Sequence, residues 1–160
     1  MSEVPFVPTP KKVVRRMLEL AEVTPEERVY DLGAGDGRIP IEAAKVFHAV
    51  GIGVEIHPVR YGLFRKNVEK EGLSGKVLTL KDDFFKVDLK RADIVTLYLL
   101  SKTNAMLRPK LEAEIKPTTR VVAHDFPVPG WKPYAVEQVV VDGKLHKIYL
   151  YVPGRSFKVR

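Results

Sequence analysis

Short apolar runs alternate along this chain with stretches whose apolar residues recur at helical spacing. Strands are predicted at residues 28–32, 50–55, 76–80, 92–100 and 120–126, the fourth of them almost wholly apolar. Helices are predicted at 10–22, 39–47, 58–71 and 102–115. Such alternation is typical of a parallel α/β sheet. The end of the chain differs, because residues 134–141 and 145–152 flank an Asp-Gly turn and predict a β-hairpin.

A glycine-rich turn separates the first strand from the next helix. Residues 33–37 read Gly-Ala-Gly-Asp-Gly, so a ligand can approach their backbone N–H groups and the positive end of the helix. A tight turn without a ligand would show the same pattern. Glu55 adds a second feature, because an acid at the tip of the next strand, roughly 20 residues on, accepts from ribose hydroxyls in dinucleotide-binding units. Together the two features favour a nucleoside-containing ligand.

Composition narrows the class of protein. At 160 residues with 45% apolar residues, the chain is expected to form one domain with a substantial core. It shows no transmembrane run or signal peptide, so a cytoplasmic location is expected. The absence of cysteine excludes disulfides and, with 29% charged residues and 12 prolines, fits a thermophilic source. The four histidines lack metal-ligand spacing, so no metal is expected.

The net charge of +7 raises the question of a nucleic-acid partner. The positive residues are spread through the chain, except for a group at residues 11–16 on one predicted helix, where a solvated face explains them. The chain has no RNP-type aromatic strand, zinc finger or basic tail. Nucleic acid is therefore the less favoured partner.

Asp31, two residues before the first glycine, makes the glycine-rich turn more specific. The form Asp-x-Gly-x-Gly-x-Gly from Asp31 to Gly37 resembles motif I of the seven-strand, Rossmann-like class I methyltransferases, which bind S-adenosylmethionine (SAM). The resemblance implies a single α/β domain with helices flanking a sheet of order 3-2-1-4-5-7-6, strand 7 being antiparallel. It implies an arm at residues 1–9, a helix at 10–22 and a Rossmann-like core at 28–152, within one methyltransferase domain over 1–160.

Ligands of open α/β sheets bind beyond the carboxyl ends of the strands. The backbone of the glycine turn and Asp31 would serve the amino acid part of SAM, and Glu55 its ribose. Asp83 would accept from the adenine amine and Phe84 would supply an apolar wall, although a plain turn also explains residues 82–83. The predicted cofactor site comprises Thr9, Asp31, Gly33, Gly35, Arg38, Glu55, Asp83, Phe84 and Tyr98.

Taken whole, the chain resembles a narrower family, the small archaeal protein-lysine methyltransferases, whose eukaryotic mitochondrial relatives methylate the c-ring protein of ATP synthase. The similarity rests on Val-Pro-Thr-Pro at residues 7–10, the motif at 30–38, Gly-Val-Glu-Ile at 53–56, Asp-Phe-Phe at 83–85, Leu-Leu at 99–100 and His-Asp-Phe at 124–126 before a Gly-Trp loop. It implies methyl transfer to lysine nitrogens of proteins. Tyr-Leu-Leu-Ser at 98–101 lacks the Asn/Asp-Pro-Pro-Tyr/Phe motif, which counts against a DNA adenine or release-factor enzyme.

The same resemblance suggests an acceptor side. Tyr98 and Asp125 are predicted to act in catalysis, while Tyr98, Phe126 and Trp131 would wall a channel for the aliphatic lysine stem. Trp131 as simple core packing is an equal alternative. Alignment of nucleophile, methyl and sulfur is the main requirement of the reaction, so a dedicated base is unnecessary if the amine arrives neutral.

Residues 2–8 hold too many prolines for an element of their own. We expect this arm, with Thr9, to lie across the SAM and lysine entrance and exclude water; the alternative is a disordered tail. Thr9 and Pro10 are predicted as N-cap and first residue of the following helix. The expected partners are proteins with exposed lysines, with no membrane and a monomeric enzyme. An RNA methyltransferase and a non-catalytic SAM-binding regulator remain open.

Overall fold

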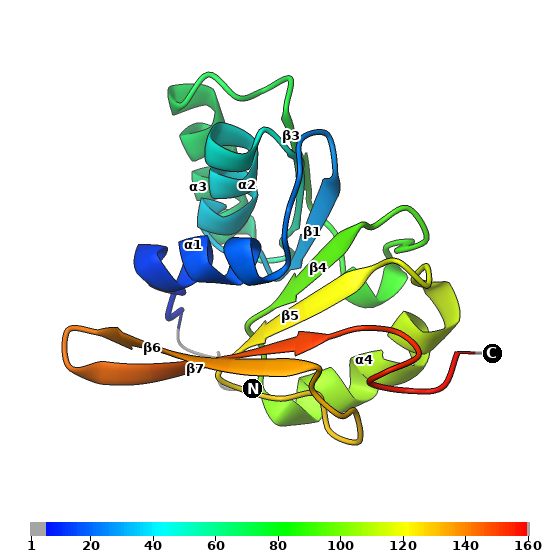
Figure 1. The fold of residues 1–160 in the computed structure, drawn as a ribbon. Coiled ribbons are helices and arrows are strands. Elements are labelled where there is room, and N and C mark those ends of the chain that lie inside the picture. The colour runs from blue at the N-terminus through cyan, green and yellow to red at the C-terminus, as the bar shows by residue number, and fades with distance from the viewer. Residues whose placement is uncertain (1–5, 160) are drawn as a thin grey trace.

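The structure, a computed structural model of the 160-residue chain, describes residues 6–159. These residues alternate between strands and helices, and the hairpin follows at the end (Figure 1). Each predicted helix and strand is present, with ends shifted by a few residues; the short 3-10 helix at residues 84–86 was not predicted. In chain order they are α1 Lys11–Leu20, β1 Arg28–Leu32, α2 Arg38–Phe47, β2 Val50–Val54, α3 Pro58–Lys70, β3 Val77–Leu80, the 3-10 helix η1 Phe84–Lys86, β4 Ile94–Leu97, α4 Ser101–Glu114, β5 Arg120–His124, β6 Ala135–Val141 and β7 Lys144–Tyr151.

All these strands join one sheet in the order β3-β2-β1-β4-β5-β7-β6, which confirms the predicted order. Neighbours among β1 to β5 pair in parallel, whereas β7 runs antiparallel to both β5 and β6. The register sets Leu32 of β1 beside Val54 of β2 and Leu97 of β4, so these strands end at one edge. The loops that follow them gather where the strand order reverses between β1 and β4, which is the ligand-binding edge of such sheets.

Helices cover both faces of the sheet (Figure 1). On one face, α1 and α2 pack through residues such as Met17 and Ile39; on the other, α4 packs through Leu107 and Leu111. Strand β4 contributes Ile94 to the first core and its other apolar residues to the second. Its almost wholly apolar sequence follows from this burial on both sides.

The first helix begins one residue later than predicted, and Thr9 is not its cap. Pro10 occupies the N-cap position of α1, and no side chain caps the helix. The Pro10 carbonyl accepts from the N–H groups of Val13 and Val14, both at 2.9 Å. The Thr9 hydroxyl bonds instead to His124 at the end of β5, so its contact is tertiary rather than local.

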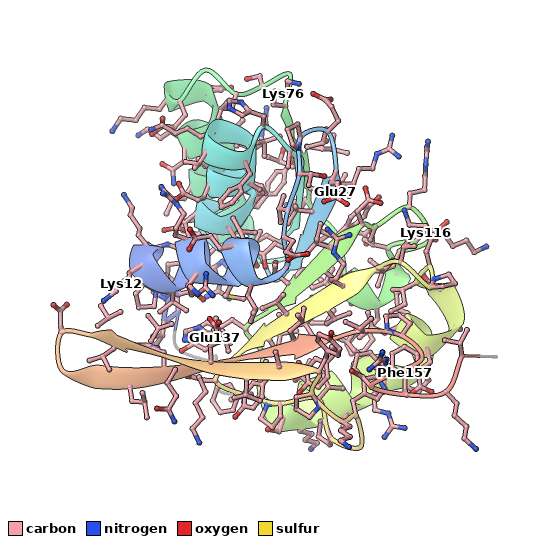
Figure 2. The ribbon with its side chains drawn as sticks, viewed as in Figure 1. Lys12, Glu27, Lys76, Lys116, Glu137 and Phe157 are labelled. Carbon is pink, nitrogen blue, oxygen red and sulfur yellow. The ribbon has the colours of Figure 1, made fainter. Side chains whose placement is uncertain are left out.

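The β6–β7 hairpin extends past the other strands, with α1 lying over it (Figure 1). Glu137 of β6 points toward α1 (Figure 2) and accepts from Arg16 Nε and Nη2, both at 2.6 Å. Asp142 and Gly143 both have positive φ, as the two central residues of a type I′ turn require. Within residues 6–159, no helix is long and apolar enough to span a membrane.

Candidate active site

The turn after β1 exposes the backbone of Gly33, whereas Gly35 is buried. Gly33 and Gly35 have φ values of +86° and +59°, a conformation that disfavours a β-carbon. The N–H groups of Gly33 and Ala34 both donate to the Val54 carbonyl at 2.9 Å, and the Gly35 N–H donates to the Glu55 carboxylate at 2.8 Å. Because these donors have partners within the protein, a ligand would meet the turn chiefly by close contact with backbone that bears no side chain.

Glu55 follows β2 directly and is 6% exposed. Its Oε1 accepts from the Gly35 N–H at 2.8 Å, and its Oε2 accepts from the His57 N–H at 3.0 Å. Arg60 Nε lies 3.7 Å from Oε2. Each carboxylate oxygen can accept more than one hydrogen bond, so the group keeps capacity for ribose hydroxyls. The predicted ribose acceptor is therefore held in place beside the glycine turn.

Asp31 lies near the end of β1 and is only 3% exposed. Its Oδ1 accepts from the Thr96 hydroxyl at 2.9 Å. Burial raises the pKa of Asp31 to about 7, and the charges of Glu55 and Asp36 act in the same direction, against the hydrogen bond from Thr96. Near neutral pH, a cation placed close to Asp31 would draw it into the ionised form.

An apolar wall lies beside the turn. A β-carbon on Gly33 would stand 3.3 Å from Leu99 Cδ2 and 4.0 Å from the Phe84 ring, so both side chains border this glycine. Asp83 precedes η1, and its Oδ1 accepts from the Phe85 N–H at 2.9 Å. Phe84 thus stands where the adenine wall was predicted. Leu99 also forms part of this apolar wall. No role was predicted for this residue, because its position after β4 is the only sign that it lies near the turn.

The described part of the arm lies against the glycine turn. A β-carbon on Gly35 would come within 2.5 Å of Phe6 Cε1, so the phenyl ring occupies the space above this glycine. The Arg60 guanidinium lies 5.6 Å from the centre of the same ring. Phe6 remains 44% exposed, so it covers the turn from the solvent side. This is the position expected of a lid; residues 1–5 of the predicted arm lie outside the described residues.

Thr9, the root of the arm, is held from two sides. Its carbonyl accepts from Arg38 Nη1 at 3.1 Å, and its hydroxyl lies 3.0 Å from His124 Nδ1. Arg38 also pairs with Asp36, with Nη2 2.7 Å from Oδ2. The Arg38 guanidinium, which was predicted to lie in the cofactor site, therefore bonds to the turn through Asp36 and to the arm through Thr9. Its link to the site runs through these two segments.

The loops after β4 and β5 bring together aromatic and acidic side chains. The rings of Tyr98 and His124 lie 4.0 Å apart between centres, tilted by 31°, and Phe126 stacks near Tyr98 at 6.3 Å. Burial raises the pKa of Tyr98, and the charge of Asp125 adds to the rise. The structure therefore gathers three predicted acceptor residues: Tyr98, Asp125 and Phe126.

The structure reveals a histidine pair behind Tyr98 that the sequence spacing did not predict. His124 Nε2 lies 2.8 Å from Nδ1 of His146, a residue of β7, and Asp125 Oδ2 lies 3.5 Å and 3.7 Å from these two atoms. His, His and carboxylate are ligand types that transition metals accept, and the three ligand atoms lie within 4.8 Å of one another. The direct hydrogen bond already pairs the two nitrogens. The pair comes from antiparallel neighbours β5 and β7, so sequence spacing conceals it.

Trp131 belongs to the core and not to the Tyr98 group. Its Nε1–H donates to Glu112 Oε2 at 2.8 Å, and its ring stacks on Phe157 at 4.4 Å and meets Tyr151 edge-on at 5.4 Å. Phe157 marks this place near the end of the chain (Figure 2). These contacts correct the channel role suggested for Trp131, because its ring is buried against α4, β7 and the C-terminal segment.

The residues at this edge fit SAM. The turn presents backbone without side chains, a buried carboxylate stands beside it at Glu55, and Phe84 and Leu99 border it. The buried Asp31 lies beneath the same turn, where a cationic ligand would compensate its ionised form. The turn and Asp31 suit the amino acid part of SAM, Glu55 suits the ribose, and Phe84 with Leu99 suits the adenine.

Comparison with known proteins decides the family. Residues 31–135 match the family model described as the ANTKMT methyltransferase domain. The chain is 51% identical to a protein-lysine N-methyltransferase of Saccharolobus islandicus, over 94% of each chain. It is also 35% identical to the adenine nucleotide translocase lysine N-methyltransferase of Mus musculus, over 84% of this chain and 58% of the mouse protein. The chain belongs to this methyltransferase family.

Structural similarity agrees with this assignment. A crystal structure described as an RNA methyltransferase from Salinibacter ruber, in complex with S-adenosyl-L-homocysteine, matches with a TM-score of 0.84 and 44% identity, over 91% of this chain and 93% of that one. The predicted family of protein-lysine methyltransferases, the class I fold and SAM as cofactor are thereby confirmed. The two similar proteins carry different substrate names, so the substrate has to be argued from the acceptor side.

Proposed function

We propose that this chain transfers a methyl group from SAM to the ε-amino nitrogen of lysine side chains in proteins. The observation that carries the proposal is the grouping of Tyr98, Phe126 and Asp125 beside the glycine turn, in a member of this family. Two flat aromatic rings suit an aliphatic stem that ends in a cation, and a carboxylate suits the cation itself. The archaeal relative with 51% identity is named for lysine methylation.

The cofactor side supplies binding and orientation. When bound, SAM supplies a methyl group on a sulfonium sulfur, which is a good leaving group. Glu55 would accept from the ribose hydroxyls, and the backbone at Gly33 and Gly35 would allow close approach. Asp31 would oppose the positive charge of the amino acid part. Phe6 and the arm would limit the access of water to the methyl group.

The acceptor side has to deliver a neutral amine. A lysine reaches the enzyme as an ammonium ion with a pKa of about 10.4. Asp125, partly exposed at the tip of β5, would attract this cation. Asp125 and the aromatic rings favour the cation, so the neutral amine has to form through loss of hydration at the nitrogen, which lowers the pKa of the ammonium group, and the proton would leave to solvent. The neutral amine would then be held in line for displacement, which is the main catalytic contribution asked of the protein.

Methylation of RNA is the second candidate, and two observations favour it. The crystal structure with 44% identity is described as an RNA methyltransferase, and this chain carries a net charge of +7. The protein substrate is preferred because the relative with 51% identity is named for protein lysine, and because the Tyr98 loop lacks the Pro-Pro motif of many enzymes that act on planar nitrogens.

A single labelling experiment separates the two. The enzyme is incubated with SAM carrying a labelled methyl group and an archaeal lysate, and the products are then treated with protease or with ribonuclease. We expect label that protease releases and that mass spectrometry assigns to lysine. The Gly35→Val variant, expected to bind SAM about 100-fold more weakly, measures the background. Label released by ribonuclease alone would replace the proposal with the RNA activity, and SAM binding without any labelled product would favour the regulator.

We further propose that the enzyme works as a monomer in the cytoplasm of a thermophilic archaeon. The relative from Saccharolobus islandicus supports an archaeal source, and the cysteine-free, highly charged composition supports a hot habitat. Light scattering should give the 18.1 kDa mass of one chain. The Tm should lie well above the ~45–65 °C typical of mesophile domains.

A further inference from the structure

Three buried polar side chains form one continuous hydrogen-bonded chain across the acceptor side. The Thr9 hydroxyl lies 3.0 Å from His124 Nδ1, and His124 Nε2 lies 2.8 Å from His146 Nδ1. His124 is 0% exposed and His146 is 5% exposed. The members come from the arm, from β5 and from β7, so the chain joins segments far apart in the sequence. Its last member, His146, is linked to the Tyr98 ring and to the arm through His124.

The short distance between the histidines requires a single shared proton. Either His146 Nδ1 donates to His124 Nε2, or the reverse; in both cases one nitrogen must be an unprotonated acceptor. A second proton would set two N–H donors facing each other at 2.8 Å. The pKa of His124 is lowered to about 4, chiefly by burial; the charge of Asp125 opposes this shift, and His146 and Lys144 act in the same direction as burial. His124 is therefore neutral near pH 7.

His124 is the point at which this chain meets the active site. One face of its ring lies against Tyr98, with 4.0 Å between the ring centres, and its Nδ1 meets Thr9, the root of the arm that covers the glycine turn. A rotation of the imidazole would disturb both contacts together. The bond to His146 fixes that rotation, because the ring is then held at both of its nitrogens.

We propose that His146 is a positioning residue of the methyl-transfer site. It acts through His124 and sets both the closed position of the arm and the place of Tyr98 against the lysine stem. The proposal rests on the proposed function for its effect on turnover, although its effect on the arm does not. His146 supplies no atom to substrate or cofactor. The role follows from the shared proton, which makes His146 different from an apolar residue of the same size.

The expected pH dependence has a definite direction. The groups that face the pair are Asp125 from the end of β5, Lys144 from β7, the Tyr98 ring and the Thr9 hydroxyl. Acid that places a proton on both facing nitrogens breaks the chain, so activity should fall on the acid side. Removal of His146 removes one cause that lowers the pKa of His124. In His146→Ala there is no bond between the rings for acid to break, so the acid limb of kcat that this bond causes should be absent, an effect that packing alone would not produce.

The central experiment compares three variants of the full chain. His146→Ala removes the bond; His146→Asn keeps a polar atom at the position of Nδ1; Val139→Ala is the control, because Val139 is buried and pairs directly with His146 across the hairpin. For His146→Ala we expect a loss of about tenfold or more in kcat, since small misplacements in a site can cost up to ~100-fold. His146→Asn should recover most of this loss, and Val139→Ala should lower the Tm without lowering kcat comparably.

A second measurement does not depend on turnover. Hydrogen exchange of the backbone over residues 6–14 reports on the arm and the start of α1, with the SAM-free protein as the sample. Faster exchange is expected in His146→Ala and not in Val139→Ala. If the wild-type enzyme methylates no protein at all, the proposed function fails, while this exchange result still tests the role of His146.

A double-mutant cycle provides the decisive outcome. Thr9→Val removes the hydroxyl at the other end of the chain and keeps the shape of the side chain. If Thr9, His124 and His146 act as one unit, the double variant Thr9→Val/His146→Ala should be little worse than either single variant in exchange and in kcat. Additive effects, an acid limb that persists in His146→Ala, or equal losses in His146→Ala and Val139→Ala would each overturn the proposal.

Discussion

The two halves of the candidate site are built in different ways. The cofactor side uses residues close together in sequence, and its contacts run mostly through backbone: the Gly33 N–H bonds to Val54, and the Gly35 N–H bonds to Glu55. The acceptor side uses side chains from distant segments, such as His124 and His146, that contact one another directly. The glycines of the turn have positive φ and tolerate few other residues. The side-chain contacts of the acceptor side, in contrast, can be removed one at a time by substitution.

This difference separates binding from turnover. Changes on the cofactor side should act on the affinity for SAM, because the turn and Glu55 would meet only the cofactor. Changes on the acceptor side should act on kcat, because they alter the position of the lysine. The arm joins the two, since Phe6 lies on Gly35 while Thr9 bonds to His124. Substitutions along the site can sharpen this separation or break it.

The largest effect is expected from Gly35→Val. A β-branched residue at a φ of +59° is strained by ~1–3 kcal/mol, and its β-carbon would stand 2.5 Å from Phe6 Cε1. This strain is present with and without SAM and should lower the Tm, whereas the isopropyl group over the turn should weaken SAM binding about 100-fold, or ~2.8 kcal/mol. Calorimetric titration measures this. Gly62→Ala is the matched control, because nothing lies within 4 Å of that β-carbon position in α3. Normal affinity in Gly35→Val would make the turn purely structural.

The next effect concerns Glu55. Glu55→Ala removes the acceptor for the ribose and also leaves the Gly35 and His57 N–H groups without their partner. A contact to a charged group is worth ~1.5–3 kcal/mol, so SAM affinity should fall about tenfold to 100-fold and the Tm should fall as well. Glu55→Gln keeps an oxygen for Gly35 and should preserve the Tm while still weakening SAM. Unchanged affinity in both variants would remove Glu55 from the cofactor site.

The sequence predicted the cofactor side of the site more completely than the acceptor side. The residues that the structure gathers on the cofactor side were almost all predicted, because Asp31, the glycines and Glu55 lie in one βαβ unit whose spacing is set by the fold. The sheet order was implied by the resemblance to the seven-strand methyltransferases. The acceptor side was predicted only in part: Tyr98 and Phe126 meet as expected, but Trp131 is core and His146 was missed. Contacts between β5 and β7 depend on the antiparallel register, which apolar periodicity does not determine.

Thr9 shows the same limit within a single residue. Local rules favour it as a helix cap before Pro10, and they correctly mark where the helix begins to within one residue. The hydroxyl nevertheless bonds His124, 115 positions away in sequence. A tertiary partner of this kind competes with the local cap and leaves no trace in the spacing of neighbouring residues.

A smaller effect is expected from the charge of Asp31. Its pKa of about 7 in the folded, SAM-free protein lies above the usual value of 3.8, so the folded state holds an extra proton between these values. Stability should therefore fall as the pH rises through this window and level off above pH 7. Asp31→Asn should remove this slope. Comparing the Tm of the two proteins from pH 5 to pH 8 tests it, because other titrating groups are common to both.

The affinity for SAM should change with pH in the opposite direction to the stability of the SAM-free protein. The positive charge of the cofactor favours ionised Asp31, so binding near neutral pH should release a proton and grow stronger as the pH rises toward the pKa. Calorimetry in buffers with different ionisation enthalpies measures the proton released. A wild-type affinity that is as flat with pH as that of Asp31→Asn would show that the cofactor does not sense this carboxylate.

The smallest effect is expected from Phe6, and it tests whether the arm really joins the two halves. Phe6→Leu keeps apolar cover above Gly35 and removes the ring that faces Arg60, 5.6 Å away. A cation–π contact at an exposed site is worth ~0.5–1 kcal/mol, so SAM affinity should fall by only about two- to fivefold, with the Tm nearly unchanged.

Deletion of residues 2–8 removes the cover altogether while Thr9 and α1 remain. If the arm is a lid for the whole site, the deletion should lower kcat far more than Phe6→Leu does, since water then reaches the acceptor side. Full kcat in the truncated enzyme, together with weakened SAM binding, would confine the role of residues 2–8 to the cofactor side.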